Sequence, residues 1–267
     1  MDSQKIPLSV MVMTKNEEKN ISECLESVAW AKDIIVLDDC STDRTQEIAR
    51  RYTEHIVERK MDIEGRHRNY GYSLAKENWI LSLDADERVS PELAEKIKKI
   101  VTQGSLTHGS LTQASTSHTG FSVPRKNYIG SYWIQHGGWY PSGQLKLFRK
   151  GTFRYQEDEV HPLAISEGSW EDLKEDIIHY SYKNFEDFVS KLNNQSTREA
   201  TKWIRTGRNM PFGIACWRTI DRFFRNYFFK KGYKDGFIGF MLAIFASLYQ
   251  ILSYAKYWEM KKNGSKP

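Results

Sequence analysis

Short apolar runs alternate with stretches of helical spacing through the first hundred residues. Runs of five or six apolar, β-prone residues are typical of strands that are buried on both faces of a parallel sheet. We expect such strands at Leu8–Met13, Asp33–Asp39, Trp79–Leu83 and, more briefly, His55–Val57. Apolar residues three or four apart predict helices between the strands, at 20–30, 43–52 and 66–77, and Ser90-Pro91-Glu92 is typical of the start of another.

This alternation predicts an α/β fold with a mostly parallel, doubly wound sheet, whose ligands bind beyond the carboxyl ends of the strands. β-like segments resume at 121–123, 145–148 and 152–155, and from Asn184 the pattern is helical to the end. We therefore expect an α/β catalytic domain over 1–183 and a helical region over 184–267. The Ser-, Thr- and Gly-rich stretch 103–120 repeats Gly-Ser-Leu-Thr and predicts a flexible surface loop.

Composition narrows the class of protein. With 40% hydrophobic and 27% charged residues among 267, the chain is expected to fold rather than stay disordered. The formal charge of +5 favours a partner that carries phosphate, without choosing which one. The three cysteines are odd in number and show no C-x-x-C spacing, so neither a disulfide framework nor a zinc site is indicated. No secretory signal is evident, and we expect a cytoplasmic setting.

Two of the predicted strands end in acidic residues. Asp84 and Asp86 are two apart, so in an extended chain both carboxylates point to one side, where they suit Mg²⁺ or Mn²⁺. An isolated D-x-D is more often a solvated turn or a helix cap. Asp38 and Asp39 end a second strand and could accept hydrogen bonds from a base or a ribose, although Asp39 could also simply cap the next helix.

Arg66 and Arg68 lie near the start of the helix predicted over 66–77. Guanidinium groups and a helix N-terminus both favour phosphate, while a solvated basic face is the plainer interpretation. Because acids, metal and arginines would converge on one sheet edge, we favour a pyrophosphate site.

These residues resemble glycosyltransferase family 2, which has the GT-A fold. The resemblance rests on Thr14-Lys15-Asn16-Glu17-Glu18, Asp38-Asp39-Cys40-Ser41-Thr42-Asp43, Arg68-Asn69-Tyr70-Gly71 and Leu83-Asp84-Ala85-Asp86-Glu87. It implies a nucleotide-sugar site that includes Thr14, Asn16 and Glu17. It further implies that Asp38 and Asp39 hold a uridine, and that Asp86, helped by Asp84, holds the divalent ion.

Other segments resemble the lipopolysaccharide core β-glucosyltransferase branch of this family in bacteria. They are His136-Gly137-Gly138-Trp139-Tyr140-Pro141, Gln144-Leu145-Lys146-Leu147-Phe148-Arg149, Val160-His161, His179-Tyr180-Ser181-Tyr182 and Tyr254-Ala255-Lys256-Tyr257-Trp258-Glu259. The chain departs from this branch at two places, with Ser142-Gly143 in place of Asp-Trp and Pro162 in place of Glu.

An inverting transferase needs a base that takes the proton of the attacking hydroxyl. Within Glu157-Asp158-Glu159, the first two residues match the acidic pair of the family pattern. We predict Asp158 as the base and Glu157 as the second choice. Three consecutive acids could equally form a solvated turn. His161 is expected to be structural or to contact the acceptor.

The C-terminal region combines basic and aromatic residues. Arg218, Arg222 and Arg225 are predicted on one helical face, opposite the apolar residues Ile220, Phe223, Phe224, Tyr227 and Phe228. This pattern is typical of a helix at a membrane surface. The uncharged run 236–255 is long enough to cross a bilayer, but polar residues dilute it, so we expect it to lie in or against the membrane. A helical pair covering the catalytic domain is the alternative.

The sequence therefore predicts an inverting, metal-dependent hexosyltransferase that uses a nucleotide-sugar, with a UDP-linked hexose expected, and acts on a lipid-linked glycan such as a lipopolysaccharide core. Its partners would be the donor, this acceptor and an anionic membrane, at the cytoplasmic face of the inner membrane and without nucleic acid. One alternative is a polyprenyl-phosphate sugar synthase, whose acceptor is a lipid phosphate. Another is a membrane-docked module that binds without catalysis, against which the intact D-x-D argues.

Overall fold

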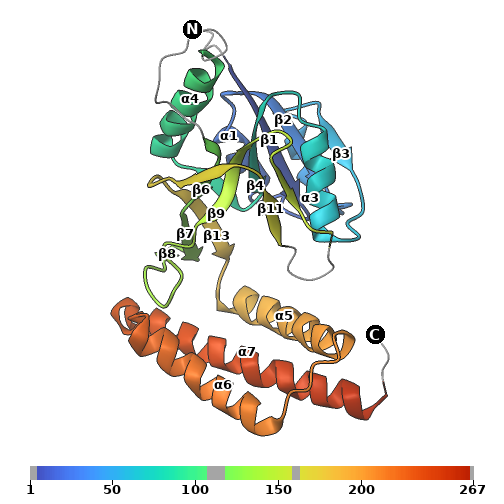
Figure 1. Cartoon of the computed structure of the whole chain (residues 1–267), viewed down its shortest axis with the longest axis vertical. Coiled ribbons are helices and arrows are strands. Elements are labelled where there is room, and N and C mark those ends of the chain that lie inside the picture. Colours follow the sequence, from blue (N-terminus) through green and yellow to red (C-terminus); the bar gives the residue numbers. More distant parts are fainter. Residues whose placement is uncertain (1–4, 107–117, 158–162, 265–267) are drawn as a thin grey trace. The chain divides into compact units, whose positions relative to one another are not determined.

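The computed structural model describes residues 5–106, 118–157 and 163–264, and many of its elements are labelled in Figure 1. The chain forms two compact units. Unit 1 comprises residues 1–125 and 143–179, and unit 2 comprises 126–142 and 180–267. Unit 2 thus includes a segment, 126–142, that lies well before the domain boundary predicted at 183.

A seven-stranded sheet is the centre of unit 1, in the order β12-β6-β9-β4-β1-β2-β3. Its strands are β1 Ile6–Thr14, β2 Ala31–Asp38, β3 Ile56–Glu58, β4 Trp79–Asp84, β6 His118–Val123, β9 Gln144–Arg149 and β12 Ser169–Asp172. The pairings among β4, β1, β2 and β3 are parallel, as is β12 with β6, whereas β9 runs antiparallel to both of its neighbours. The predicted fold class, a GT-A-like α/β domain with a mostly parallel sheet, is confirmed.

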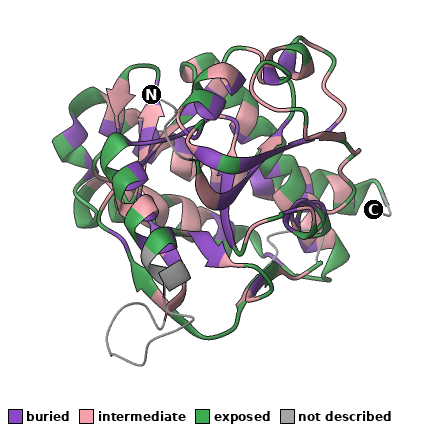
Figure 2. Ribbon diagram, turned by 90° about the horizontal axis from the view of Figure 1, so that it is seen from above, coloured by how far each residue is buried: buried purple, intermediate pink, exposed green. Residues whose placement is uncertain are grey.

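Helices cover both faces of this sheet. They are α1 Ile21–Glu26, α2 Thr45–Ala49, α3 Glu64–Ser73 and α4 Pro91–Leu106. Buried residues follow the central strands (Figure 2) and form two cores, because successive side chains point to opposite faces: Val10 belongs to the core under α1 and α4, and Met11 to the core under α3. A Cβ on Gly71 of α3 would lie 2.9 Å from Met11 Cγ, so this glycine lets α3 approach the sheet closely.

Unit 1 contains further short strands, of which only β10 was predicted. They are β5 Glu87–Val89, β10 Phe153–Tyr155 paired with β11 Ala164–Ser166, and β13 Ile177–Tyr182, which runs antiparallel to β5 and continues into unit 2. Most are too short to show alternation, and only the position of β10 had been expected. The prediction of a loop over 103–120 was wrong at both ends, because α4 continues to Leu106 and β6 begins at His118; residues 107–117 lie outside the described ranges.

Unit 2 is mainly helical, as predicted from Asn184 onward. Its elements are the end of β7 Arg125–Ile129, β8 Tyr132–Trp133, α5 Phe185–Arg205, α6 Phe212–Phe224, the π-helical turn η1 Arg225–Phe229, the 3₁₀ turn η2 Gly232–Asp235 and α7 Gly236–Lys262. The Asn184 side chain caps α5 by accepting a hydrogen bond of 2.8 Å from Asp187 N. Stacked rings of Phe188 and Phe245, with centroids 4.9 Å apart, join α5 to α7.

The helical face predicted from Arg218 to Phe228 is interrupted in the structure. The α-helical turn gives way to a π-helix at Arg225, so spacing by 3.6 residues no longer places later side chains. Arg225 also donates to Asp221 on the preceding turn at 3.0 Å. The π-helix therefore changes the expected placement of the later residues Tyr227 and Phe228, whereas the grouping of Arg218, Arg222 and Arg225 on one face stays a prediction.

Candidate functional site

The carboxyl ends of three parallel strands meet at one edge of the sheet of unit 1. In the register of β1, Thr14 lies opposite Asp38 of β2, and Met13 lies opposite Asp84 of β4. Asp39 N donates to Thr14 O, and Ala85 N donates to Met13 O, which continues this alignment beyond the strands. The expectation that both acidic strand ends lie at the same edge is confirmed.

The loops after β1 and β2 are fastened to each other by hydrogen bonds. Asn16 N donates to Ser41 Oγ and Asn16 Oδ1 accepts from Thr42 N, each at 2.8 Å. Glu17 N donates to Thr45 Oγ1 at 2.8 Å. Asn16 and Glu17, predicted at the nucleotide, thus hold the shape of this edge, and Asn16 does so at a φ of +53°.

The two acids at the end of β2 differ in what they bind. The buried carboxylate of Asp38 accepts from Ser41 N and from Gln46 Nε2, both at 2.8 Å, so it holds its own turn. Asp39 accepts from Met61 N and from Lys15 Nζ, both at 2.7 Å. Burial raises the pKa of Asp39, but these two hydrogen bonds outweigh it and lower that pKa below its usual range. Its partner Lys15 is largely exposed.

Arg68 and Asp84 form the centre of an ionic network. Arg68, which is 8% exposed, donates to Glu64 at 3.0 Å and to Asp84 Oδ1 at 2.8 Å. Asp84 Oδ2 lies 3.6 Å from Lys146 Nζ. Burial raises the pKa of Asp84, but Arg68 and Lys146 outweigh it and hold that pKa far below its usual range. Both oxygens of Asp84 therefore face cations of the chain itself.

Lys146 and Glu87 are buried site residues that the sequence analysis assigned no role. Lys146 Nζ donates to Glu87 Oε2 at 2.6 Å, and the two residues are 3% and 0% exposed. The sequence does contain a signal for this buried pair: Lys146 lies inside the apolar segment 145–148, where burying an unpaired charge would be costly. A pairing partner near the D-x-D could have been inferred from it.

Asp86 faces His179, a residue far from it in the sequence. Asp86 Oδ2 lies 3.4 Å from His179 Nε2, and His179 of β13 is paired in register with Glu87 of β5. Both side chains keep partial exposure, 21% for Asp86 and 16% for His179. A carboxylate and an imidazole in this arrangement are ligands that a divalent transition ion accepts. No group of three or more metal-binding side chains occurs among the described residues.

Arg66 and Glu157 form an exposed ion pair in unit 1. Arg66 Nε lies 2.9 Å from Glu157 Oε2, and Arg66 Nη1 lies 2.7 Å from Asp62 Oδ2. This contact occupies one oxygen of the Glu157 carboxylate with a cation of the chain itself. Asp158, the preferred base, lies outside the described residues, as does His161.

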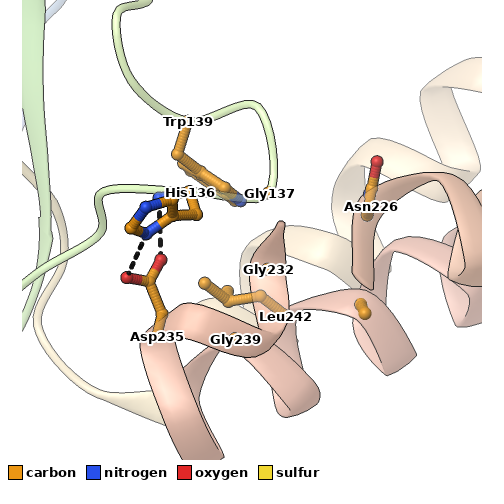
Figure 3. Close-up of a pocket in the computed structure, with 9 residues that line it drawn as sticks. His136, Gly137, Trp139, Asn226, Gly232, Asp235, Gly239 and Leu242 are labelled. Atoms are coloured by element: carbon orange, nitrogen blue, oxygen red, sulfur yellow. Dashed lines mark hydrogen bonds and ion pairs between the residues drawn. The ribbon is translucent and has the colours of Figure 1, made fainter. Parts of the chain in front are cut away.

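A second cluster of polar groups, in unit 2, is structural. His136 Nδ1 lies 2.9 Å from Asp235 Oδ1, and His136 N donates to Asp235 Oδ2 at 2.8 Å (Figure 3). The adjoining cavity measures about 10 Å³, room for a single water at most. Asp235 thus ties the loop at His136 to the start of α7, and the close approach of Gly232 to Gly239 leaves no space for a ligand.

Residues 9–157 match the sequence model described as glycosyl transferase family 2, which is more than half of the chain. The chain belongs to this family. It is 24% identical to the lipopolysaccharide core biosynthesis glycosyltransferase LpsC of Rhizobium meliloti, with 98% of this chain and 96% of that protein covered. An uncharacterised glycosyltransferase of Rickettsia typhi is 23% identical over 95% of this chain and 87% of its own length.

Among solved structures, the S. aureus TarS fragment 1–349 is 17% identical, with 97% of this chain and 92% of that chain covered and a TM-score of 0.40. The family membership makes the chain a nucleotide-sugar transferase. It also gives the row of acids and arginines at the sheet edge of unit 1 its chemical context.

Proposed function

We propose that this family 2 glycosyltransferase inverts the configuration of a hexose as it moves it from a UDP-sugar to a hydroxyl of a lipid-linked glycan, with a lipopolysaccharide core as the acceptor class. The observation that carries the proposal is the alignment of Thr14, Asp38 and Asp84 on adjacent parallel strands, where ligands of open α/β sheets bind. The match to an LPS core biosynthesis glycosyltransferase over nearly its whole length supports the acceptor class.

In this proposal Asp39 accepts from the uracil or the ribose, since it lies at the strand end with an exposed lysine as one partner. Asp38 contributes indirectly by holding the turn that follows β2. Arg66 offers the more exposed guanidinium for the diphosphate, because Arg68 is enclosed by Glu64 and Asp84. The leaving diphosphate is thereby met by positive charge from α3.

The residues present fit a divalent ion, with Asp86 as its carboxylate ligand and His179 as a second side chain. Asp84, which sequence alone had paired with Asp86, orients Arg68 instead, because both of its oxygens are engaged. When bound, the ion would supply positive charge to the leaving diphosphate, whose oxygens and water complete its coordination. Asp158 remains the proposed base, and Arg66 holds Glu157 away from that role.

Unit 2 supplies a surface suited to one leaflet of an anionic membrane. Segment Gly232–Lys262 is long and apolar enough to cross a bilayer, yet only 33% of its most apolar window is buried inside the protein. Around the turn before α7, exposed Phe229 (81%) and Phe237 (69%) lie among the exposed lysines Lys230, Lys231 and Lys234. Aromatic rings beside lysines favour an interfacial position, at the cytoplasmic face in this proposal.

A groove between α6 and α7 extends this apolar surface. It has a volume of about 410 Å³ and is lined by side chains that include Ile220, Phe223 and Leu248. The apolar lining of this groove supports contact with lipid acyl chains.

A screen of nucleotide-sugars tests the proposal. A ligand that binds only the folded state at 100 times its Kd adds about 2.7 kcal/mol to the free energy of unfolding, which is about 5–10 °C in Tm for a chain of this size. We expect a UDP-sugar with Mn²⁺ to give this shift, and transfer onto a lipid-linked core glycan to follow. Stabilisation by no UDP-sugar, or sugar transfer to polyprenyl phosphate alone, would overturn the proposal.

A further inference from the structure

A polar pocket of about 280 Å³ lies in unit 1, next to the sheet edge where the carboxyl ends of β1, β2 and β4 meet. Its floor comes from two antiparallel strands, β4 and β9, whose register places Ile80 opposite Phe148 in the core under α3. Since alternate residues share a face, Ser82 and Asp84 of β4 continue on that same face. On β9 the register shifts at Lys146, and both Lys146 and Gln144 reach the pocket. These four residues all line the pocket.

The opposite wall is built by α3 and β10. Glu64 and Arg68 lie four apart on α3, and Tyr155 of β10 places its ring 5.9 Å from the Arg68 guanidinium. Asn69 fixes Tyr155 by donating to its carbonyl and accepting from its N–H, both at 2.9 Å. The asparagine of the motif Arg68-Asn69-Tyr70-Gly71 therefore positions an aromatic ring at this pocket.

The charges that line the pocket cancel. Glu64 and Asp84 are paired with Arg68, and Lys146 lies between Asp84 and the fully buried Glu87. A diphosphate would therefore find no net positive field in this pocket. The walls instead offer both donors and acceptors around a small volume, at the lower end of the range for ligand sites.

We propose that this pocket holds the neutral sugar ring of the nucleotide-sugar donor, an assignment that rests on the proposed function. The amide of Gln144 and the ammonium of Lys146 then contact sugar hydroxyls, and the ring of Tyr155 covers an apolar face of the sugar. Asp84 belongs both to this pocket and to the sheet edge proposed to bind the nucleotide. The anomeric carbon of the sugar therefore lies toward Asp86 and the diphosphate. Gln144, Lys146 and Tyr155 thereby determine which hexose is accepted.

The test compares UDP with UDP-sugars by isothermal titration in Mn²⁺. Gln144 is exposed and Tyr155 is half-buried, so Gln144→Ala and Tyr155→Leu leave the core closed. Lys146→Met would instead remove the cation nearest to the buried Glu87. The probes are UDP, UDP-glucose, UDP-galactose and UDP-N-acetylglucosamine. Gln135→Ala, an exposed glutamine of unit 2, is the matched control.

We expect each of the two pocket variants to weaken the tightest-binding UDP-sugar by about 5- to 10-fold, the effect of losing one hydrogen bond or ring contact, with UDP affinity unchanged. The control should bind both ligands as the wild type does. An equal loss for UDP would make the pocket a diphosphate site, and unchanged UDP-sugar affinity would make it a water-filled gap; either result overturns the assignment. If the wild type binds no UDP-sugar at all, the proposed function itself fails and the pocket assignment with it.

Discussion

The two units bury and expose opposite kinds of side chain. Unit 1 encloses charged groups around a polar pocket, with Glu87 at 0%, Lys146 at 3% and Arg68 at 8% exposure. Unit 2 leaves large apolar groups on its surface, with Phe229 at 81% and Trp217 at 66%. Buried charge is costly unless it is paired, and exposed apolar area is costly unless it is covered. Unit 1 therefore pairs its buried charges internally around a site, whereas the exposed apolar side chains of unit 2 form the surface for which a membrane is proposed above.

The largest expected effect concerns the metal ligand in unit 1. Asp86→Ala removes a partly exposed carboxylate without opening a core, so the protein should stay folded. Loss of a metal ligand costs several kcal/mol of transition-state stabilisation, or at least about 10⁴-fold in kcat/KM. His179→Ala should lose activity in the same direction and should require more Mn²⁺ for half-maximal rate.

Rates measured over a Mn²⁺ titration, before and after EDTA treatment, would check this result. Asp172→Ala, at an exposed strand end of the same unit, is the control and should keep wild-type rates. Full activity of Asp86→Ala at every metal concentration would contradict the assignment.

The second prediction separates the two candidate bases. Asp158→Asn should lower kcat by about 10²- to 10⁴-fold with donor binding nearly unchanged, as expected for loss of a general base. Glu157→Gln should lower it much less, because Arg66 already engages that carboxylate. Single-turnover rates alongside UDP-sugar titrations distinguish chemistry from binding. If Glu157→Gln shows the larger loss, the two roles are exchanged.

The third prediction tests the exposed face of unit 2. Replacing Lys230, Lys231 and Lys234 together by Gln should weaken binding to anionic liposomes by about two orders of magnitude at low salt, since each basic residue near the surface contributes about 1 kcal/mol. The matched triple, Arg218, Arg222 and Arg225 to Gln, should have a smaller effect, because Arg225 is paired with Asp221. Donor binding in unit 1 should not change in either variant.

Flotation with anionic and neutral liposomes at two salt concentrations measures this comparison. Binding that ignores lipid charge and salt, together with retention after carbonate washing, would favour a spanning helix over the interfacial position. Absence of any liposome binding would favour an apolar surface that is covered by protein.

Sequence predicted most of unit 1 because its strands are long and its chemistry lies at their ends. The apolar runs that begin at Leu8 and Trp79 predict the central strands. The polar and acidic residues after them predict the sheet edge where the site lies. Contacts between distant segments could not be read in this way. Nothing in the spacing shows that His179 meets Asp86, or that Lys146 occupies the second oxygen of Asp84, because both depend on which strands pair.

The helical region shows the same limit for a local reason. Periodicity found the helices after Asn184 correctly, yet a π-helical turn at Arg225 changed which side chains share a face. A sequence that reads as one amphipathic α-helix contains no signal for this extra residue per turn. The exposed lysines after it were consequently overlooked, although they stand beside the most exposed phenylalanine.

The smallest expected effect is an acid sensitivity confined to unit 1. His67 is fully buried and accepts a hydrogen bond from Arg59 through Nδ1 at 2.9 Å. Burial, followed by the positive charges of Arg59 and Arg68, lowers its pKa below the usual 6.5, and Asp39 and Asp62 only partly oppose this. The unfolded chain therefore binds a proton more readily than the folded one, so stability is complete above about pH 6.5 and falls as the pH drops toward the lower folded pKa.

Hydrogen exchange of the two units measured between pH 7 and 5 tests this effect. For unit 1 the free energy of opening should fall by up to about 1.4 kcal/mol per pH unit, the limit for one proton, and His67→Gln should flatten that slope. His118→Gln, a half-buried histidine of the same unit, should retain the slope. Unit 2 lacks this buried group, so its exchange should respond less to pH. Two results would contradict this prediction: the same pH slope of the opening free energy in both units, or the same slope in His67→Gln and the wild type. Either would show that His67 has the same protonation in the folded and unfolded states and that other groups cause the acid sensitivity.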